Sequence, residues 1–159
     1  MNKRTNMLVM MAMMIALNVV LSRFVSINAW NIKIGFTFVT VYVIAHQYGY
    51  IAAAVTAALG DFIGAILFPI GPYYPPFTIS AAVTGIVYGL LLYQNEDTKR
   101  IIAAVAINQF IIGLLINSYW IHLLYKADFA ALLSTRILQS CIMTAVEIIT
   151  IKLINKYLF

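Results

Sequence analysis

Long apolar runs separated by short polar segments are the feature that most limits how this chain can fold. The sequence is 64% hydrophobic and only 9% charged, whereas soluble globular domains carry about 25% charged residues. A run of about 20 apolar residues is long enough to cross a bilayer as a helix. The sequence therefore predicts an all-α, polytopic membrane protein and argues against a soluble globular domain.

Six apolar runs occupy most of the 159 residues. We expect a single six-helix transmembrane domain over residues 1–159, with spans at 5–24, 34–47, 50–68, 78–93, 101–124 and 132–154. The second span is short, so we expect it to be tilted or partly buried among its neighbours. The first run continues to Leu21 without a following A-x-A site, which indicates a span rather than a cleaved signal peptide.

The distribution of basic residues predicts the orientation of these spans. An even number of spans places both termini on one side of the membrane. That side would carry Lys3, Arg4, Lys99, Arg100, Lys152 and Lys156. Because Lys and Arg are enriched in cytoplasmic loops, we expect the two termini to be cytoplasmic.

Four cations, Arg23, Lys33, Lys126 and Arg136, fall at the opposite, external ends of the spans. Attraction of an anionic ligand explains such a placement. The alternative is that they are anchors whose charged heads reach the interface, and we favour this for Lys126. Arg23 and Arg136 lie inside or close to apolar runs, where an unpaired guanidinium is costly, which favours a ligand-binding role for them.

The segment from Asp61 to Phe77 joins two apolar runs through a loop rich in Gly, Pro and Tyr. A carboxylate within an apolar run costs free energy unless it faces a protein interior or a cavity, so Asp61 is a candidate binding residue. Proline stiffens a loop. We therefore expect a lid loop over a pocket near the external face, containing Gly71, Pro72, Pro75 and Pro76.

Aromatic, cationic and amide side chains gather at the predicted external ends. They are Arg23, Trp30, Lys33, Phe36, Tyr73, Tyr74, Phe77, Asn117, Tyr119, Trp120 and Arg136. Aromatic faces suit a flat heterocycle, cations suit carboxylates, and a buried carboxylate can accept two hydrogen bonds from an amidine-like edge. The set predicts a flat, amino-substituted ring with an anionic tail as the ligand. For each aromatic residue taken alone, the alternative is an interfacial belt.

Other chemistries lack a signature in this sequence. No G-x-x-x-x-G-K-[ST] or G-x-S-x-G motif is present. His46 and His122 are predicted at opposite membrane faces, and the single Cys141 offers neither a disulfide nor metal-ligand spacing. We therefore expect neither an enzyme nor a metal site.

Only two acidic residues, Asp61 and Glu147, lie well inside the spans, which is too few for a proton path. Transport against a concentration gradient would therefore need a partner protein that supplies the energy. We interpret Glu147 either as a structural residue paired with a polar neighbour in the inner half or as a functional group.

Several segments together carry a resemblance to a known family. They are IKIGFTF (32–38), DFIGAILFPIGPYYPPFT (61–78), GIVYGLLLY (85–93), INSYWI (116–121) and STRILQ (134–139). The chain resembles the folate-specific substrate-binding subunits, or S components, of energy-coupling factor (ECF) transporters along nearly its whole length. One departure is Pro76, where the family's lid loop is expected to have Gly.

The resemblance implies high-affinity binding of folate from outside the cell, as the transported ligand and with no cofactor. It also implies a prokaryotic plasma-membrane protein that docks on a transmembrane coupling subunit carrying two cytoplasmic ATPases, which alone would hydrolyse ATP. The family's A-x-x-x-A motif matches Ala12 and Ala16, the implied docking surface. The alternative for these alanines is ordinary packing within the chain.

On this basis we expect Asp61 or Asn117 to form hydrogen bonds with the polar edge of the pterin ring. The aromatic residues expected to stack on the rings are Tyr74, Phe77 and Trp120, and the cations expected to meet the carboxylates are Arg23, Lys33 or Arg136. Rival interpretations are an S component for riboflavin, thiamine or a queuosine precursor, a stand-alone carrier or channel, and a small membrane enzyme or assembly factor.

Overall fold

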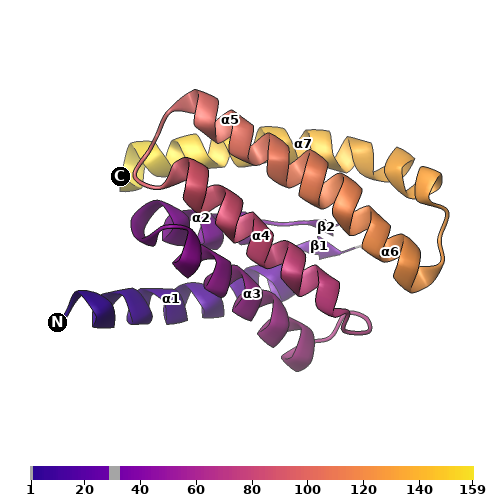
Figure 1. The fold of residues 1–159 in the computed structure, drawn as a ribbon, viewed down its shortest axis with the longest axis horizontal. Coiled ribbons are helices and arrows are strands. Elements are labelled where there is room, and N and C mark those ends of the chain that lie inside the picture. The colour runs from indigo at the N-terminus through magenta and orange to yellow at the C-terminus, as the bar shows by residue number, and fades with distance from the viewer. Residues whose placement is uncertain (1, 29–32) are drawn as a thin grey trace.

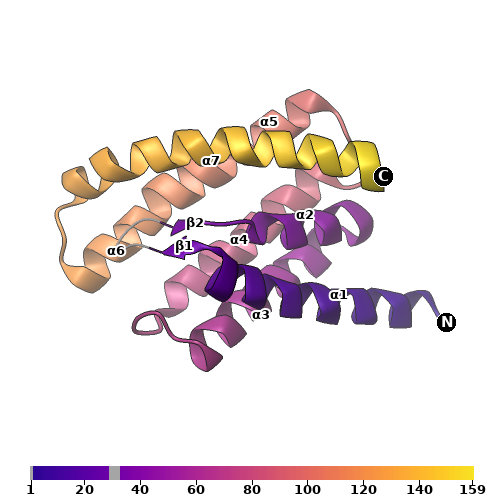
Figure 2. The same cartoon turned by 180° about the vertical axis from the view of Figure 1, so that it is seen from behind.

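The two termini lie at the same end of a bundle of helices, as both views show (Figures 1 and 2). The computed structural model describes residues 2–28 and 33–159. Its elements are α1 (Lys3–Val20), η1 (Leu21–Val25), β1 (Ile27–Asn28), β2 (Lys33–Ile34), α2 (Thr37–Tyr48), α3 (Tyr50–Leu67), α4 (Pro75–Leu92), α5 (Thr98–Ala106), η2 (Ile107–Ile116), α6 (Asn117–Tyr125) and α7 (Phe129–Leu158). The segments η1 and η2 are π-helical.

Helix η1 continues α1, and α5, η2 and α6 follow one another without a break. The described residues therefore form the six helical segments that the sequence predicted, and the helical fold class is confirmed. Within the described residues, five helices are long and apolar enough to cross a membrane: Lys3–Val25, Tyr50–Leu67, Pro75–Leu92, Thr98–Tyr125 and Phe129–Leu158. The molecule is a multi-pass membrane protein.

Helix α2 is the exception among the six. Its 12 residues reach about 18 Å at 1.5 Å per residue, which is shorter than a hydrocarbon core of about 30 Å. Its residues Phe38 and 40–46 are buried, and it contacts α1, α3, α4 and α7. Of the two expectations for this short run, burial among the neighbours is therefore the one that the structure supports.

Helices α3 and α4 pack closely because α4 presents glycines to α3. A Cβ atom on Gly89 would lie 2.1 Å from Tyr50 Cα, and one on Gly85 would lie 2.5 Å from the Ala53 carbonyl oxygen. Any larger residue would push the two backbones apart. The small-xxx-small spacing of these glycines thus serves helix packing.

The structure corrects several predicted boundaries. Helix α4 begins at Pro75, not at residue 78, so Pro75 and Pro76 form its first turn and are not part of the loop. Proline suits this position because an N–H group in the first turn would have no intrahelical partner, so its absence costs no hydrogen bond. The φ angle of proline is also already helical. Helix α7 extends beyond 132–154 at both ends, through apolar residues at 129–131 and through Asn155 and Lys156 at the other end, where the hydropathy falls.

A short antiparallel pair was not predicted. Strand β1 pairs with β2, with Ile27 opposite Ile34 and Asn28 opposite Lys33. Two-residue strands are too short to leave an alternating hydrophobic pattern in the sequence. The pairing fixes the position of Lys33 in the segment that joins η1 to α2.

Candidate binding pocket

A cavity of about 440 Å³ opens between the helices. Several residues that contribute to it, including Lys33, Ile70, Gly71 and Tyr125, are exposed and lie in the loops and helix ends remote from the termini. Its other end lies within the bundle, where Glu147 is only 2% exposed. The cavity therefore has a mouth remote from the termini and a closed deep end nearer to them.

Most of the site residues predicted from the sequence line this cavity. They are Arg23, Lys33, Asp61, Tyr74, Phe77, Asn117 and Arg136, together with Gly71 and Pro72 of the predicted lid loop. Phe36 and Tyr119 do not line it, and both are more than 40% exposed. Trp30 lies outside the described residues.

Trp120 stands behind the cavity wall. Its indole Nε1 donates a hydrogen bond to Ser80 Oγ at 3.0 Å, and its ring meets that of Tyr74 edge-on, with centroids 6.4 Å apart. Tyr74 also packs edge-on against Phe77, at 5.8 Å. Tyr74, Phe77 and Ser80 line the cavity. Trp120 therefore holds the aromatic wall in position without forming part of its surface.

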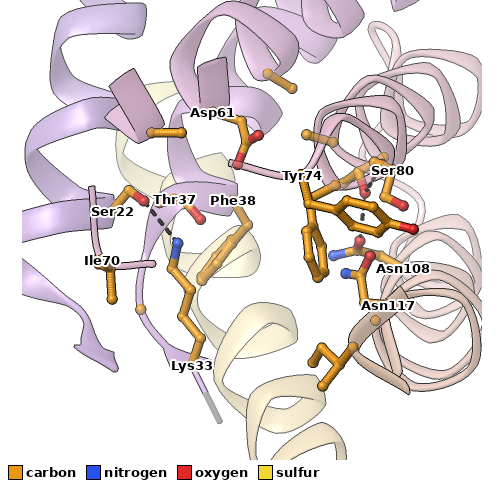
Figure 3. A pocket seen from close by; sticks show the side chains of 18 of the residues that line it. Ser22, Lys33, Thr37, Phe38, Asp61, Ile70, Tyr74, Ser80, Asn108 and Asn117 are labelled. Atoms are coloured by element: carbon orange, nitrogen blue, oxygen red, sulfur yellow. Dashed lines mark hydrogen bonds between the residues drawn. The ribbon is translucent and has the colours of Figure 1, made fainter. Parts of the chain in front are cut away.

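Two cations lie on the side of the cavity formed by α1, η1 and β2. The β-pair and the π-helical turn bring Lys33 next to Ser22, and Lys33 Nζ donates a hydrogen bond to Ser22 Oγ at 2.8 Å (Figure 3). The stem of Lys33 is exposed, but its ammonium group is turned inward. Burial lowers the pKa of Lys33 to about 8, with a smaller contribution from the charge of Arg23 that Asp61 opposes.

The guanidinium of Arg23 lies against Gly64 of α3, where a Cβ atom would come within 3.0 Å of Arg23 Nε. Glycine at this position makes room for the side chain. Arg23 Nε is buried and has no hydrogen-bond partner within residues 2–28 and 33–159. A buried N–H without a partner is uncommon in folded proteins, and Arg23 is also one of the residues that line the cavity.

Asp61 lies one turn before Gly64 on α3 and is already engaged. Its Oδ2 accepts a hydrogen bond from Thr78 Oγ1 at 2.7 Å, and Thr78 Oγ1 lies 3.0 Å from the hydroxyl of Tyr73. Asp61 thus ties α3 to the start of α4 and to the loop between them. Its charge also offsets part of the positive charge of Arg23 and Lys33.

A third cation, Arg136, comes from α7. Its Nη2 donates to the Gly113 carbonyl of η2 at 3.1 Å, while its Nε is buried and has no partner in the part of the chain that the structure describes. Two residues of the cavity lining, Asn117 and Gln139, also have a buried carbonyl oxygen without a partner among these described residues. Figure 3 shows Lys33 and Ser22 on one side of the cavity and Tyr74, Asn108 and Asn117 on the other.

Sequence reasoning missed a polar cluster at the deep end. Glu147 accepts hydrogen bonds from the Tyr88 hydroxyl at 2.6 Å, from Gln109 Nε2, and more weakly from Asn108 Nδ2 at 3.4 Å. Asn108 Oδ1 in turn accepts from Thr84 Oγ1 at 3.0 Å. The polar neighbours expected for Glu147 are therefore present. Asn108 and Gln109 line the cavity together with Glu147, whereas Tyr88 lies behind the cavity wall. Asn108 and Gln109 were recognisable in the sequence as consecutive amides within an apolar span.

The histidines lie apart from the cavity lining. His46 Nδ1 is 3.0 Å from the Leu92 carbonyl, and His122 Nδ1 contacts the Ala127 carbonyl near the opposite end of the bundle. Across residues 2–28 and 33–159, no group of three or more His, Cys, Asp or Glu side chains is arranged to hold a metal ion.

Comparison with known proteins places the chain among membrane transport proteins. Residues 2–159 match the family described as "ECF-type riboflavin transporter, S component". The folate transporter FolT of Clostridium novyi is 35% identical over 94% of this chain and 87% of its own length. The FolT of Leuconostoc mesenteroides is 30% identical over 91% of this chain and 81% of its own length.

The fold has a counterpart among solved structures. A crystal structure of a FolT bound with folic acid superposes with a TM-score of 0.89 and 28% sequence identity. The match covers 98% of this chain and 95% of that one.

Proposed function

Because this chain belongs to the S-component family of ECF-type transporters, we propose that it binds folate and delivers it for uptake. The observation that carries the proposal is the chemistry of one cavity, in which three cations face an aromatic wall. Folate is a flat pterin joined through an aminobenzoyl ring to a glutamyl tail with carboxylates. The cavity offers a complementary group for each of these parts.

In this proposal the cations hold the tail. Arg23 and Arg136 line the cavity, each with a buried Nε that has no partner among the described residues, and Lys33 turns its ammonium group inward. Tyr74 and Phe77 stack on the rings, and Trp120 supports Tyr74 from behind. Phe36 and Tyr119 lie away from the cavity, so they receive no role.

The partners follow from the family. The chain docks on a transmembrane coupling subunit that carries two cytoplasmic ATPases, and ATP is hydrolysed only there. It resides in a prokaryotic plasma membrane, with the termini cytoplasmic and the mouth of the cavity outside. Ala12 and Ala16 support this docking, since both are exposed on α1 and are not packed within the chain.

Riboflavin is the second candidate ligand, because the matching family is described by that vitamin. Riboflavin has a flat ring system that the aromatic wall also suits, but it has no carboxylate for the cations. Folate therefore accounts for more of the cavity than riboflavin does.

Fluorescence titration of the purified protein in detergent tests the ligand. Trp120 packs against the cavity wall through Tyr74 and Ser80, so ligand binding should change its emission. We expect a saturable response to nanomolar folate, and no response to riboflavin or thiamine. A response to riboflavin but not to folate, in folded protein free of bound vitamin, would reverse the assignment.

Replacing Arg136 with Ala tests the anion site. The variant removes the guanidinium that lies beside Gly113, and a hydrogen bond to a charged group is worth about 1.5–3 kcal/mol. We expect folate affinity to fall by about tenfold or more. Arg100→Ala, at the exposed start of α5, is the matched control and should bind normally. Unchanged affinity in R136A would remove Arg136 from the site.

A further inference from the structure

Two glycines on α3 each receive a side chain from the first helix. A Cβ atom on Gly60 would lie 2.5 Å from Asn18 Oδ1, and one on Gly64 would lie 3.0 Å from Arg23 Nε. The two glycines are both buried and lie one turn apart on the same face of α3. They therefore form two notches in the surface of α3, one for Asn18 and one for Arg23.

The two side chains that enter these notches are not spaced as the glycines are. Gly60 and Gly64 are four residues apart, whereas Asn18 and Arg23 are five residues apart. In a regular α-helix, residues five apart point about 140° away from each other around the axis. From residue 21 to residue 25, however, the chain forms the π-helical turn η1, and such a turn holds one more residue. Arg23 therefore stays on the side of the helix that faces α3.

Asn18 fixes the register of the first helix just before this turn. Its Nδ2 donates a hydrogen bond to Thr40 Oγ1 of α2 at 2.7 Å. Because Asn18 is held in this way, the geometry of η1 decides which later residue faces Gly64. A regular α-helix would bring Ser22 there, four residues after Asn18, whereas the structure brings Arg23.

The contact with Gly64 keeps Arg23 beside two other charged residues of the cavity lining. Lys33 repels Arg23 and Asp61 attracts it. Arg23 Nε has no hydrogen-bond partner in residues 2–28 and 33–159, so this nitrogen does not hold the side chain against the repulsion. A larger residue at position 64 would therefore let the guanidinium move away from its place in the cavity.

We propose that Gly64 is a positioning residue for ligand binding, which together with η1 directs the Arg23 guanidinium towards the anionic tail of the ligand. The inference rests on the proposed function, in which Arg23 is one of the cations that hold this tail. A methyl group at position 64 would lie 3.0 Å from Arg23 Nε, so the guanidinium would have to move. Gly64 thus acts on the ligand through Arg23.

Two ligands separate this role from ordinary helix packing. Folate carries the anionic tail, whereas the neutral amide of pteroic acid keeps both ring systems and has no carboxylate. We expect wild-type protein to bind folate about tenfold or more tightly than the amide. In Gly64→Ala this preference should fall about threefold or more, because the charged donor is displaced. A packing role alone would weaken the two ligands equally and leave the preference unchanged.

Gly60→Ala is the matched control. Its Cβ would also crowd the contact between α1 and α3, but it meets the neutral Asn18 and not Arg23. The preference of G60A for folate over the amide should therefore equal that of wild type. An equal loss of preference in G60A and G64A would show that crowding alone causes it, and would overturn the inference.

A double-mutant cycle with Arg23→Ala gives a second test. If Gly64 acts through Arg23, then R23A lowers the preference for folate, and adding G64A lowers it no further. Additive losses would overturn the inference, and so would a G64A protein that keeps the wild-type preference. Should G64A fail to fold, adding R23A should restore folding because it empties the notch. A double variant that also fails to fold would assign Gly64 to backbone packing and reject the positioning role.

The wild-type measurements separate this inference from the function on which it rests. Folate binding without a preference over the neutral amide would overturn the inference and leave folate as the ligand. Failure of wild-type protein to bind folate at all would reject the proposed function and the inference together.

Discussion

At the scale of single residues, the site depends on polar groups that the fold leaves without partners. Within the described ranges, Arg23 and Arg136 each have a buried Nε without a partner, and Asn117 and Gln139 each have a buried carbonyl oxygen without one. Buried polar atoms are nearly always satisfied in folded proteins, since an unmet hydrogen bond costs about 1–3 kcal/mol. All four residues also line the cavity, so a bound ligand lies next to side chains with unmet hydrogen-bonding capacity.

Lys33 makes binding dependent on pH. With its pKa lowered to about 8, its ammonium is charged below that pH and becomes neutral as the pH rises through it. An anionic ligand favours the charged form, so affinity is full below about pH 8 and falls above it. Between about pH 7 and pH 9.5 we expect folate affinity to fall about fivefold beyond any change due to the ligand itself, since a charged donor is worth about 1 kcal/mol more than a neutral one.

The control for this prediction is Lys33→Arg, which stays charged throughout that range. Ionisation of folate affects the two proteins equally, so the difference between their titrations isolates Lys33. Identical pH profiles would show that the Lys33 ammonium does not contact the ligand's anionic tail.

At the scale of secondary-structure elements, two features shape the cavity: the π-helical segments and the close packing of α4 on α3. The π-helical segments η1 and η2 carry cavity residues, among them Arg23, Asn108 and Gln109. Such geometry is often found at functional sites because it alters the direction of side chains within a helix. The glycines of α4 bring it onto α3, and α4 carries the aromatic wall.

Replacing Gly89 with Ala tests the close packing of these helices. Its Cβ would lie 2.4 Å from the backbone nitrogen of Tyr50, so the two helices must separate. Overpacking of this kind costs about 1–3 kcal/mol. We expect a lower thermal unfolding midpoint in detergent. Leu90→Ala, at a residue 61% exposed on the same helix, should change it little; equal midpoints for G89A and wild type would contradict the packing argument.

At the scale of the whole molecule, the cavity and the proposed docking surface are separate. The cavity lies between the helices, whereas Ala12 and Ala16 are exposed on α1 nearer the N-terminus. Ligand binding and partner docking can therefore be disturbed independently. Small side chains at a helix surface permit the close approach of another membrane helix.

Ala16→Trp places a bulky side chain on the proposed docking surface. We expect normal folate binding by the isolated variant, but loss of co-purification with the coupling subunit and loss of folate uptake in cells. Ala131→Trp, which adds the same side chain at an exposed position on α7, should support normal uptake. Normal uptake by A16W would remove this face of α1 from the docking surface.

The amino-acid sequence by itself determined the membrane class, the number of helical segments and several of the residues that line the cavity. Apolar runs and isolated charges indicate whether a segment lies in lipid, in water or in a protein interior. This can be inferred from the residues of the segment itself. For the same reason the apolar sequence around Arg23, Asp61 and Arg136 was enough to identify them as candidate binding residues.

The tertiary structure alone decided which polar residues converge. Glu147 meets Tyr88, Asn108 and Gln109 through contacts between α4, η2 and α7, and such convergence leaves no periodic trace in one sequence. It also decided that Phe36 and Tyr119 lie outside the cavity. A side chain's partners depend on how helices rotate and pack against one another, and that packing is set by the whole bundle rather than by neighbouring residues.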